Sequence, residues 1–206
     1  EGNSHMEFRQ IASLGRFKDI VIILIKYGFD DLVQRLDLGA TPVLKKIHKA
    51  GQGLGTYERI RLALEDLGPT FIKFGQVMSL RPDLLPQKLI TELVKLQDEV
   101  APVPVDTIRE TVERNLQLPL KDVFSVFDED PLGAASLAQV HRGVLRKEGT
   151  IVSIKVQRPG IQKKVQKDLD ILESVAEQIH ERSEELRFYD LPNLVRVTRR
   201  NLLREL

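Results

Sequence analysis

The chain has 206 residues, 42% of them hydrophobic and 30% charged, which is typical of a globular protein with one good core or two small ones. Its formal net charge of +1 gives no basic stripe, so a nucleic-acid partner is not expected. The absence of cysteine excludes disulfides, thiolate metal sites and cysteine nucleophiles. His48, His141 and His180 lie far apart in the sequence, and no metal site built on them is expected.

Residues 1–5, which precede Met6, resemble a cloning remnant and are set apart from the fold. A helix is predicted over residues 17–35, with an apolar run at 20–25 that is far shorter than the roughly 20 apolar residues of a membrane span. The run favours burial against neighbouring helices, and docking on a membrane surface or a partner is the alternative. Residues 39–55 are predicted to form a connection around a short basic helix.

The next segment is predicted to be helical throughout. One helix begins near Tyr57 and ends at Gly68, a typical C-terminal cap, and Pro69 begins a second helix that reaches Leu80. A third helix is predicted after Pro86 up to Leu96. Proline residues at 102 and 104 mark a joint before a short helix that ends near residue 116, with residue 106, an aspartate, as its N-terminal cap.

After Pro119 the hydrophobic pattern changes from a helical period to alternation. Strands are predicted at residues 123–127, 138–145 and 151–156, followed by a long amphipathic helix and a last helix that begins at Pro192. The last helical pattern runs to Leu206 without a stop signal, which suggests a truncation inside a larger protein. The predicted fold class is therefore α+β.

Small residues and a lone lysine mark the candidate site within these strands. The turn Ala134, Ala135 and Ser136 precedes one strand, and Lys155 lies inside the next apolar strand. Small side chains allow a backbone to approach phosphates closely, and a cation in such a strand is costly unless it meets an anion. An ordinary hairpin turn and an edge-strand lysine whose ammonium group reaches water are the alternatives. For His141, a structural hydrogen bond is expected rather than catalysis.

A polar strip on the helix that begins at Pro69 is the second candidate. Lys73 and Gln76 lie one helical turn apart among apolar residues, and a strip of this kind usually points at something. A lysine that simply reaches solvent is the alternative.

The chain resembles the UbiB family of atypical protein-kinase-like proteins, which is tied to isoprenoid-quinone (coenzyme Q) biosynthesis. The resemblance runs from about Leu67 to Leu206. It rests on a Lys-x-Gly-Gln motif, its flanks and an alanine-rich loop: Lys73-Phe74-Gly75-Gln76, Arg81-Pro82-Asp83-Leu84-Leu85-Pro86, Leu96-Gln97-Asp98, and Ala134-Ala135-Ser136-Leu137-Ala138-Gln139-Val140-His141. It implies a helical extension (6–118) packed on a truncated kinase-like small lobe (119–206), with the large lobe absent.

The resemblance also implies site residues and cofactors. ATP with Mg²⁺ would bind at Ala134, Ala135, Ser136 and Lys155, and Lys73 and Gln76 would enter the nucleotide cleft while Gly75 packs on the small lobe. Arg204-Glu205-Leu206 looks like the start of the family's Glu-x-Asp motif, so Glu205 is the expected partner of Lys155, with Glu173 and Glu177 in reserve. The catalytic aspartate and the metal ligands would lie beyond Leu206, so the chain alone is expected to be inactive.

The parent protein is thus interpreted as a kinase-like ATPase or kinase of quinone or related lipid biosynthesis. The alternative is a catalytically idle module that presents its helical extension to a membrane or to partner proteins. Expected partners are ATP, lipids or quinone-biosynthesis proteins, a peripheral membrane surface, and further copies of the chain through self-association. No signal peptide or membrane span is predicted, and a cytoplasmic or membrane-associated location is expected for the parent.

Overall fold

The computed structural model describes residues 15–35, 53–97 and 100–206. The chain divides into two compact units, which are described separately: a helical unit of Glu1–Gln97 with Lys163–Glu205, and a sheet unit of Asp98–Gln162 with Leu206. The expected cloning remnant lies outside the described residues, and so does the expected basic connection up to residue 52. The boundary predicted between the helical extension and the kinase-like small lobe, at residues 118/119, remains a prediction.

The helical unit begins with a helix over residues 15–26, followed by α2 (Asp30–Arg35). The prediction of one helix over 17–35 was wrong, because the chain turns at Gly28, where the backbone φ is 78° and a residue with a side chain would be strained. Ile20, Val21 and Ile25 of the first helix are buried, which confirms that its apolar run forms core.

Two helices meet at a sharp joint in this unit. α3 (Thr56–Leu67) ends at Gly68, whose φ is 95° and whose N–H group donates to the carbonyl groups of Leu64 and Glu65. Pro69 then begins α4 (Pro69–Ser79), as predicted. α5 (Gln87–Leu93) follows Pro86 and ends three residues before the predicted end at Leu96.

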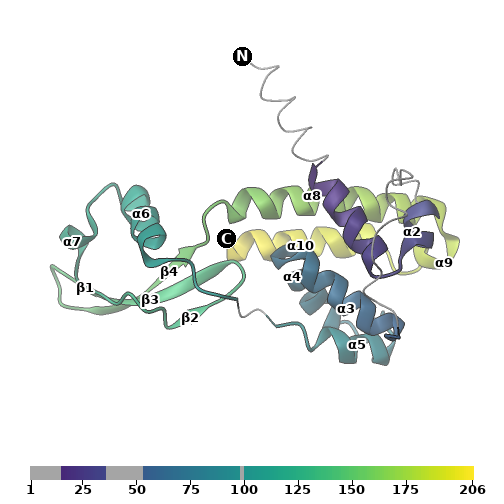
Figure 1. Ribbon diagram of the computed structural model, residues 1–206, viewed down its shortest axis with the longest axis horizontal. Coiled ribbons are helices and arrows are strands. Elements are labelled where there is room, and N and C mark those ends of the chain that lie inside the picture. Colours follow the sequence, from purple (N-terminus) through teal and green to yellow (C-terminus); the bar gives the residue numbers. More distant parts are fainter. Residues whose placement is uncertain (1–14, 36–52, 98–99) are drawn as a thin grey trace, which may run out of the picture. The chain divides into compact units, whose positions relative to one another are not determined.

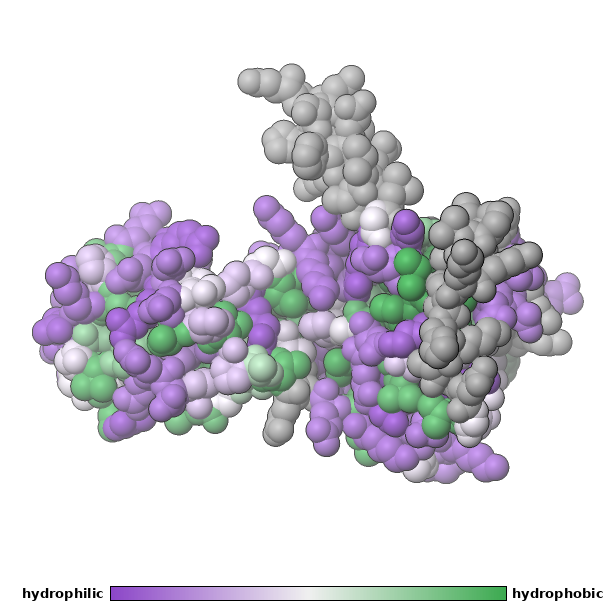
Figure 2. Space-filling model, viewed as in Figure 1, coloured by the Kyte–Doolittle hydropathy of each residue, from purple (hydrophilic) through white to green (hydrophobic). Residues whose placement is uncertain are grey.

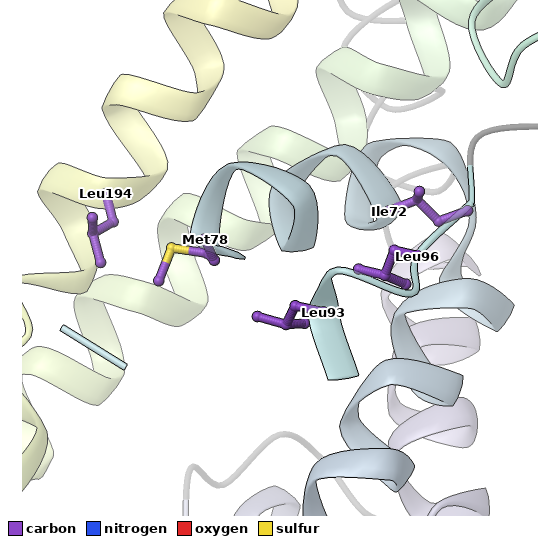
Figure 3. Close-up of a cluster of buried hydrophobic side chains, with 5 residues drawn as sticks. All are labelled: Ile72, Met78, Leu93, Leu96 and Leu194. Carbon is purple, nitrogen blue, oxygen red and sulfur yellow. The ribbon is translucent and has the colours of Figure 1, made fainter. Parts of the chain in front are cut away.

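The remaining helices of this unit come from the end of the chain. They are α8 (Ile161–Arg182), the short α9 (Glu184–Arg187), which was not predicted, and α10 (Leu191–Glu205). α8 and α10 run side by side (Figure 1), and Arg199 of α10 forms ion pairs with Asp170 and with Glu173, the latter at 3.2 Å. Buried side chains from α4, α5, α10 and the segment after α5 form one core cluster (Figure 3): Ile72, Met78, Leu93, Leu96 and Leu194.

Within residues 100–160, the sheet unit contains two helices and four antiparallel strands. The helices are α6 (Val105–Leu116) and α7 (Leu120–Val123), and the strands are β1 (Phe124–Phe127), β2 (Gly133–Ala134), β3 (Ala138–Leu145) and β4 (Ile151–Gln157). β3 is central and pairs with the other three strands. The three predicted strands and the α+β class are confirmed. The two-residue β2 was not predicted, because so short a strand leaves no alternation to detect.

The two faces of β4 differ in burial. Its even-numbered residues Val152, Ile154 and Val156 pack toward a core that includes Ile108 and Val112 of α6. Its odd-numbered residues from 151 to 155 are exposed, so the sheet has one face toward α6 and one open face.

Hydrophilic residues cover much of the face of each unit that Figure 2 draws, with apolar residues interspersed. Among the residues that the structure describes, no helix combines the length and the apolar character that a bilayer crossing requires.

Candidate functional site

The small-residue turn joins β2 to β3. Ala134 pairs with Gln139, and the backbone N–H of Ala135 donates to the carbonyl of Ala138 at 2.8 Å. The two alanines are partly exposed, whereas Ser136 is only 1% exposed. The alanines therefore form the accessible part of this turn, and the serine side chain belongs to its buried side.

Arg158, the residue after β4, is hydrogen-bonded to the backbone of the turn. Its Nε donates to the carbonyl of Ala135 at 2.8 Å, one terminal amino group donates to the carbonyl of Ala101 at 2.8 Å, and its backbone N–H donates to Leu137 at 2.9 Å. Arg158 is not among the site residues predicted from the sequence. The antiparallel register could have revealed it, because Gln157 opposes Ala138 and the next residue therefore lies beside the turn.

Lys155 lies on the open face of the sheet. It is exposed and opposes Val140 of β3, which in turn opposes Gly133 of β2. The lysine is two residues from Gln157, about 7 Å along the strand from the position beside the turn. An ammonium group, a half-buried aliphatic side chain and a small-residue turn thus share one region of the sheet, and this donor set fits a phosphate-bearing ligand with an apolar portion.

His141 belongs to the opposite, buried face. The Gln139 side-chain oxygen accepts a hydrogen bond from the Val103 N–H at 2.8 Å, so its amide nitrogen is the atom that donates to His141 Nε2 at 2.8 Å. His141 Nδ1 then carries the proton and donates to the carbonyl of Asp128 at 2.8 Å. The ring is fully buried and stacks on Phe127 with 5.0 Å between centroids. The structural hydrogen bond expected for His141 is confirmed.

The polar strip of α4 contacts other parts of the helical unit. The Gln76 amide donates to the carbonyl of Leu96 at 3.1 Å. Gly75 was expected to pack on the kinase-like lobe, and this was wrong: the space where its side chain would stand is filled by Leu64, Leu93 and Leu96 of the helical unit. Gly75 therefore permits close packing of α4 against α3, α5 and the segment after α5.

Lys73 and Glu205, two predicted site residues from opposite parts of the sequence, come together. Lys73 Nζ lies 3.9 Å from Glu205 Oε2, and the two side chains are 21% and 51% exposed. Lys155 belongs to the sheet unit, so its pairing with Glu205 remains a prediction. Of the reserve candidates, Glu173 binds Arg199 and Glu177 is exposed on α8.

Within residues 15–35, 53–97 and 100–206, no three histidine or acidic side chains converge into a group that could hold a metal ion.

Comparison with known proteins supplies the family context. The family model described as "ABC1 atypical kinase-like domain" matches residues 95–206. "Probable protein kinase UbiB" of Vibrio cholerae serotype O1 (strain M66-2) is 37% identical over 202 residues, covering 95% of this chain and 37% of that protein. The protein of the same name from Shewanella sp. (strain ANA-3) is 36% identical over 177 residues, covering 82% and 32%. The resemblance to UbiB proteins is confirmed, and the chain spans about a third of the length of these relatives.

A solved structure was also matched, that of the Rv3197–erythromycin complex from Mycobacterium tuberculosis. It is 23% identical, covers 66% of this chain and 35% of that chain, and has a TM-score of 0.40. At that score the likeness adds nothing to the assignment.

Proposed function

This chain belongs to the ABC1 atypical kinase-like family, and from that premise we propose that it is the nucleotide-binding part of a kinase or ATPase. The parent protein would act in isoprenoid-quinone or related lipid biosynthesis. The observation that carries the proposal is the position of Lys155, exposed on the open face of the sheet and close to the Ala134–Ser136 turn. That arrangement offers one ammonium group and close backbone access to the same ligand.

ATP with Mg²⁺ would supply a phosphoryl group for transfer or hydrolysis. Lys155 would bind the phosphate oxygens, and the partly exposed Ala134 and Ala135 would let the phosphates approach the backbone. Val140, half-buried beside Lys155, would contact an apolar part of the nucleotide. Arg158 would keep the turn in place through its hydrogen bond to the carbonyl of Ala135.

The resemblance further implies that Lys73, Gln76 and Glu205 of the helical unit take part in nucleotide binding, and we propose this as a separate step. Lys73 Nζ lies 3.9 Å from Glu205 Oε2, so this carboxylate would neutralise Lys73 when no phosphate is bound. A second ammonium group at the phosphates would bind them strongly and restrict transfer to a protein hydroxyl, which favours hydrolysis or a small lipid-linked acceptor.

The test is Lys155→Ala in the full-length protein, with Lys147→Ala, an exposed lysine in the same hairpin, as the matched control. Removing the charged donor should weaken ATP binding about tenfold or more in calorimetry, because hydrogen bonds to charged groups are among the strong ones. The control should bind ATP like the wild type.

Equal ATP affinity of the Lys155→Ala and Lys147→Ala proteins would overturn the assignment of Lys155. A wild-type protein that binds ATP without turning it over would instead support the idle interaction module.

A further inference from the structure

A buried carboxylate lies at the centre of the helical unit. Asp168 of α8 is 0% exposed, and it receives hydrogen bonds from Arg16 Nε at 2.6 Å, from an Arg16 terminal amino group at 3.2 Å and from the Thr70 hydroxyl at 2.8 Å. Thr70 is itself 0% exposed. Burying a charged group costs much free energy unless the group is paired and hydrogen-bonded. The donors from Arg16 and Thr70 therefore offset the cost of burying the Asp168 carboxylate.

The same donors fix the joint between α3 and α4. Arg16 also donates to the carbonyl of Leu67, the last residue of α3, at 2.5 Å, and its guanidinium lies 5.8 Å from the ring centroid of Phe71. Thr70 is the second residue of α4. These contacts therefore connect both sides of Gly68 to α8. We call the four groups that make them the Asp168 cluster: Arg16, the Leu67 carbonyl, Thr70 and Asp168.

The Asp168 cluster is linked to Lys73 through α4. Lys73 follows Thr70 by three residues, which places the two side chains on neighbouring parts of one helix surface. An α-helix is stiff over one turn, so a rotation of α4 that breaks the bond from Thr70 to Asp168 also turns Lys73.

The Asp168 cluster is linked to Glu205 through α8 and α10. Asp170, two residues after Asp168, and Glu173 both bind Arg199 of α10. Glu205 ends the same α10 helix. Lys73 and Glu205 thus lie on two helices that are each attached to the region around Asp168.

We propose that Arg16, Thr70 and Asp168 are positioning residues that set the contact between Lys73 and Glu205, so that the first described helix, residues 15–26, controls Lys73. The functional part of this proposal rests on the nucleotide site proposed above. A purely structural role would predict a loss of stability in variants of the Asp168 cluster with no selective effect on the Lys73 contact.

The contact between Lys73 and Glu205 can be measured without an activity assay. A water-soluble carbodiimide activates a carboxylate as an O-acylisourea, and the deprotonated amine of a lysine in contact displaces the urea to form an amide. Mass spectrometry of the digested chain then quantifies the cross-link between Lys73 and Glu205. The cross-link between Lys95 and Glu92, an ion pair next to α5, is the internal reference. Glu205→Gln should abolish the Lys73 cross-link and so identify the carboxylate.

Thr70→Val removes one donor to Asp168 while keeping the shape of the side chain, and Thr70→Ser keeps the hydroxyl as the matched control. We expect the ratio of the Lys73 cross-link to the reference to fall roughly tenfold in Thr70→Val, the population shift that a lost hydrogen bond to a charged group can produce. Thr70→Ser should keep the wild-type ratio.

Arg16→Gln is the second test variant and should also lower the ratio of the Lys73 cross-link to the reference. Wild-type ratios in folded Thr70→Val and Arg16→Gln chains would overturn the proposal.

Activity assays on the full-length protein separate this proposal from the proposed function. Lys73→Ala should change nucleotide preference or autophosphorylation, and Thr70→Val should do the same in the wild-type background but not when added to Lys73→Ala. If Lys73→Ala leaves activity unchanged while Thr70→Val lowers the cross-link ratio, the role of Lys73 is refuted and the positioning stands. If Lys73→Ala changes activity while Thr70→Val keeps the wild-type cross-link ratio, the positioning alone is refuted.

Discussion

At the scale of single residues, the Gln139 amide connects the loop before α6 to the buried ring of His141. We predict that Gln139→Leu lowers the free energy of unfolding by about 2 kcal/mol or more, because the Val103 N–H and the His141 ring nitrogen both lose a partner in the interior. Urea denaturation of the chain measures this. Gln166→Leu, on the exposed surface of α8, is the control and should change stability little.

The same hydrogen bonds determine the tautomer of His141, which should carry its proton on Nδ1. Nitrogen-15 NMR of the imidazole reports the protonated nitrogen directly. A proton on Nε2 would contradict the hydrogen-bond assignment.

Gly75 is a second residue whose identity follows from packing. A methyl group there would overlap Leu96 Cδ1 and come within 3.0 Å of Leu64 Cδ1. Overpacking a core costs about 1–3 kcal/mol and the higher helix propensity of alanine returns up to about 1 kcal/mol, so Gly75→Ala should be destabilised by about 1 kcal/mol net.

Chemical denaturation of Gly75→Ala beside Gly133→Ala tests this. Gly133 is exposed in β2, its φ is not positive and a side chain there would meet no described atom within 4 Å, so Gly133→Ala should change stability by about 0.5 kcal/mol or less. Equal losses in both variants would show that Gly75 is not required by its neighbours.

At the scale of elements, a charge network joins α3 to α5. Glu92 accepts from Lys95 at 2.5 Å and from Arg61 at 3.0 Å, and these two hydrogen bonds, that of Lys95 first, lower the pKa of Glu92 below its ordinary value of 4.5. A carboxylate with a lowered pKa in the folded state stabilises the protein above its unfolded pKa, and this stabilisation is lost as the pH falls through the folded pKa.

Glu92→Gln should therefore be less stable than the wild type at pH 7, and the difference should shrink as the pH falls below 4.5. Urea midpoints of both proteins between pH 7 and pH 3 measure this difference. A gap that stays constant over that range would mean that the ion pairs of Glu92 contribute nothing to folding.

The elements themselves were largely predictable where local chemistry decides them. Gly68 followed by Pro69 ends one helix and begins the next, and β-branched residues over 151–156 form a strand, because these preferences act over a few residues. The break at Gly28 was missed since a single glycine inside an apolar pattern does not prove a turn.

The contacts of the site were less predictable, because they depend on residues distant in sequence. Nothing local links Lys73 to Glu205 or Arg16 to Asp168. The sequence held one sign of the contact between Arg16 and Asp168. Asp168 lies between Val165 and Leu169 on the apolar face of a long amphipathic helix, where a charged residue requires a buried partner.

At the scale of the whole molecule, the sheet unit apart from Leu206 is one continuous stretch of chain with its own core. Ile108, Val112 and Phe124 are buried together with residues of β4. We predict that a polypeptide of residues 98–162 folds alone, with a cooperative transition and a stability of a few kcal/mol, as expected for so small a core. Circular dichroism during urea denaturation measures it.

Ile108→Ala provides the control for this polypeptide. Ile108 is 0% exposed, and its truncation should cost about 2–5 kcal/mol, enough to abolish the transition. A polypeptide that shows no transition even without the substitution would mean that the sheet unit depends on the helical unit to fold.

The helical unit is interrupted in the chain by the sheet unit, and this order affects folding during synthesis. Arg16 and Asp168 are 152 positions apart, so at common rates of translation Asp168 is added roughly eight to thirty seconds after Arg16. The apolar side chains of the first helix, which pack against Ile171 and Val175 of α8, lack that partner for the whole interval. The nascent chain would therefore complete its sheet on the ribosome before the helix of residues 15–26, although this helix is synthesised ahead of the sheet, gains its α8 partner.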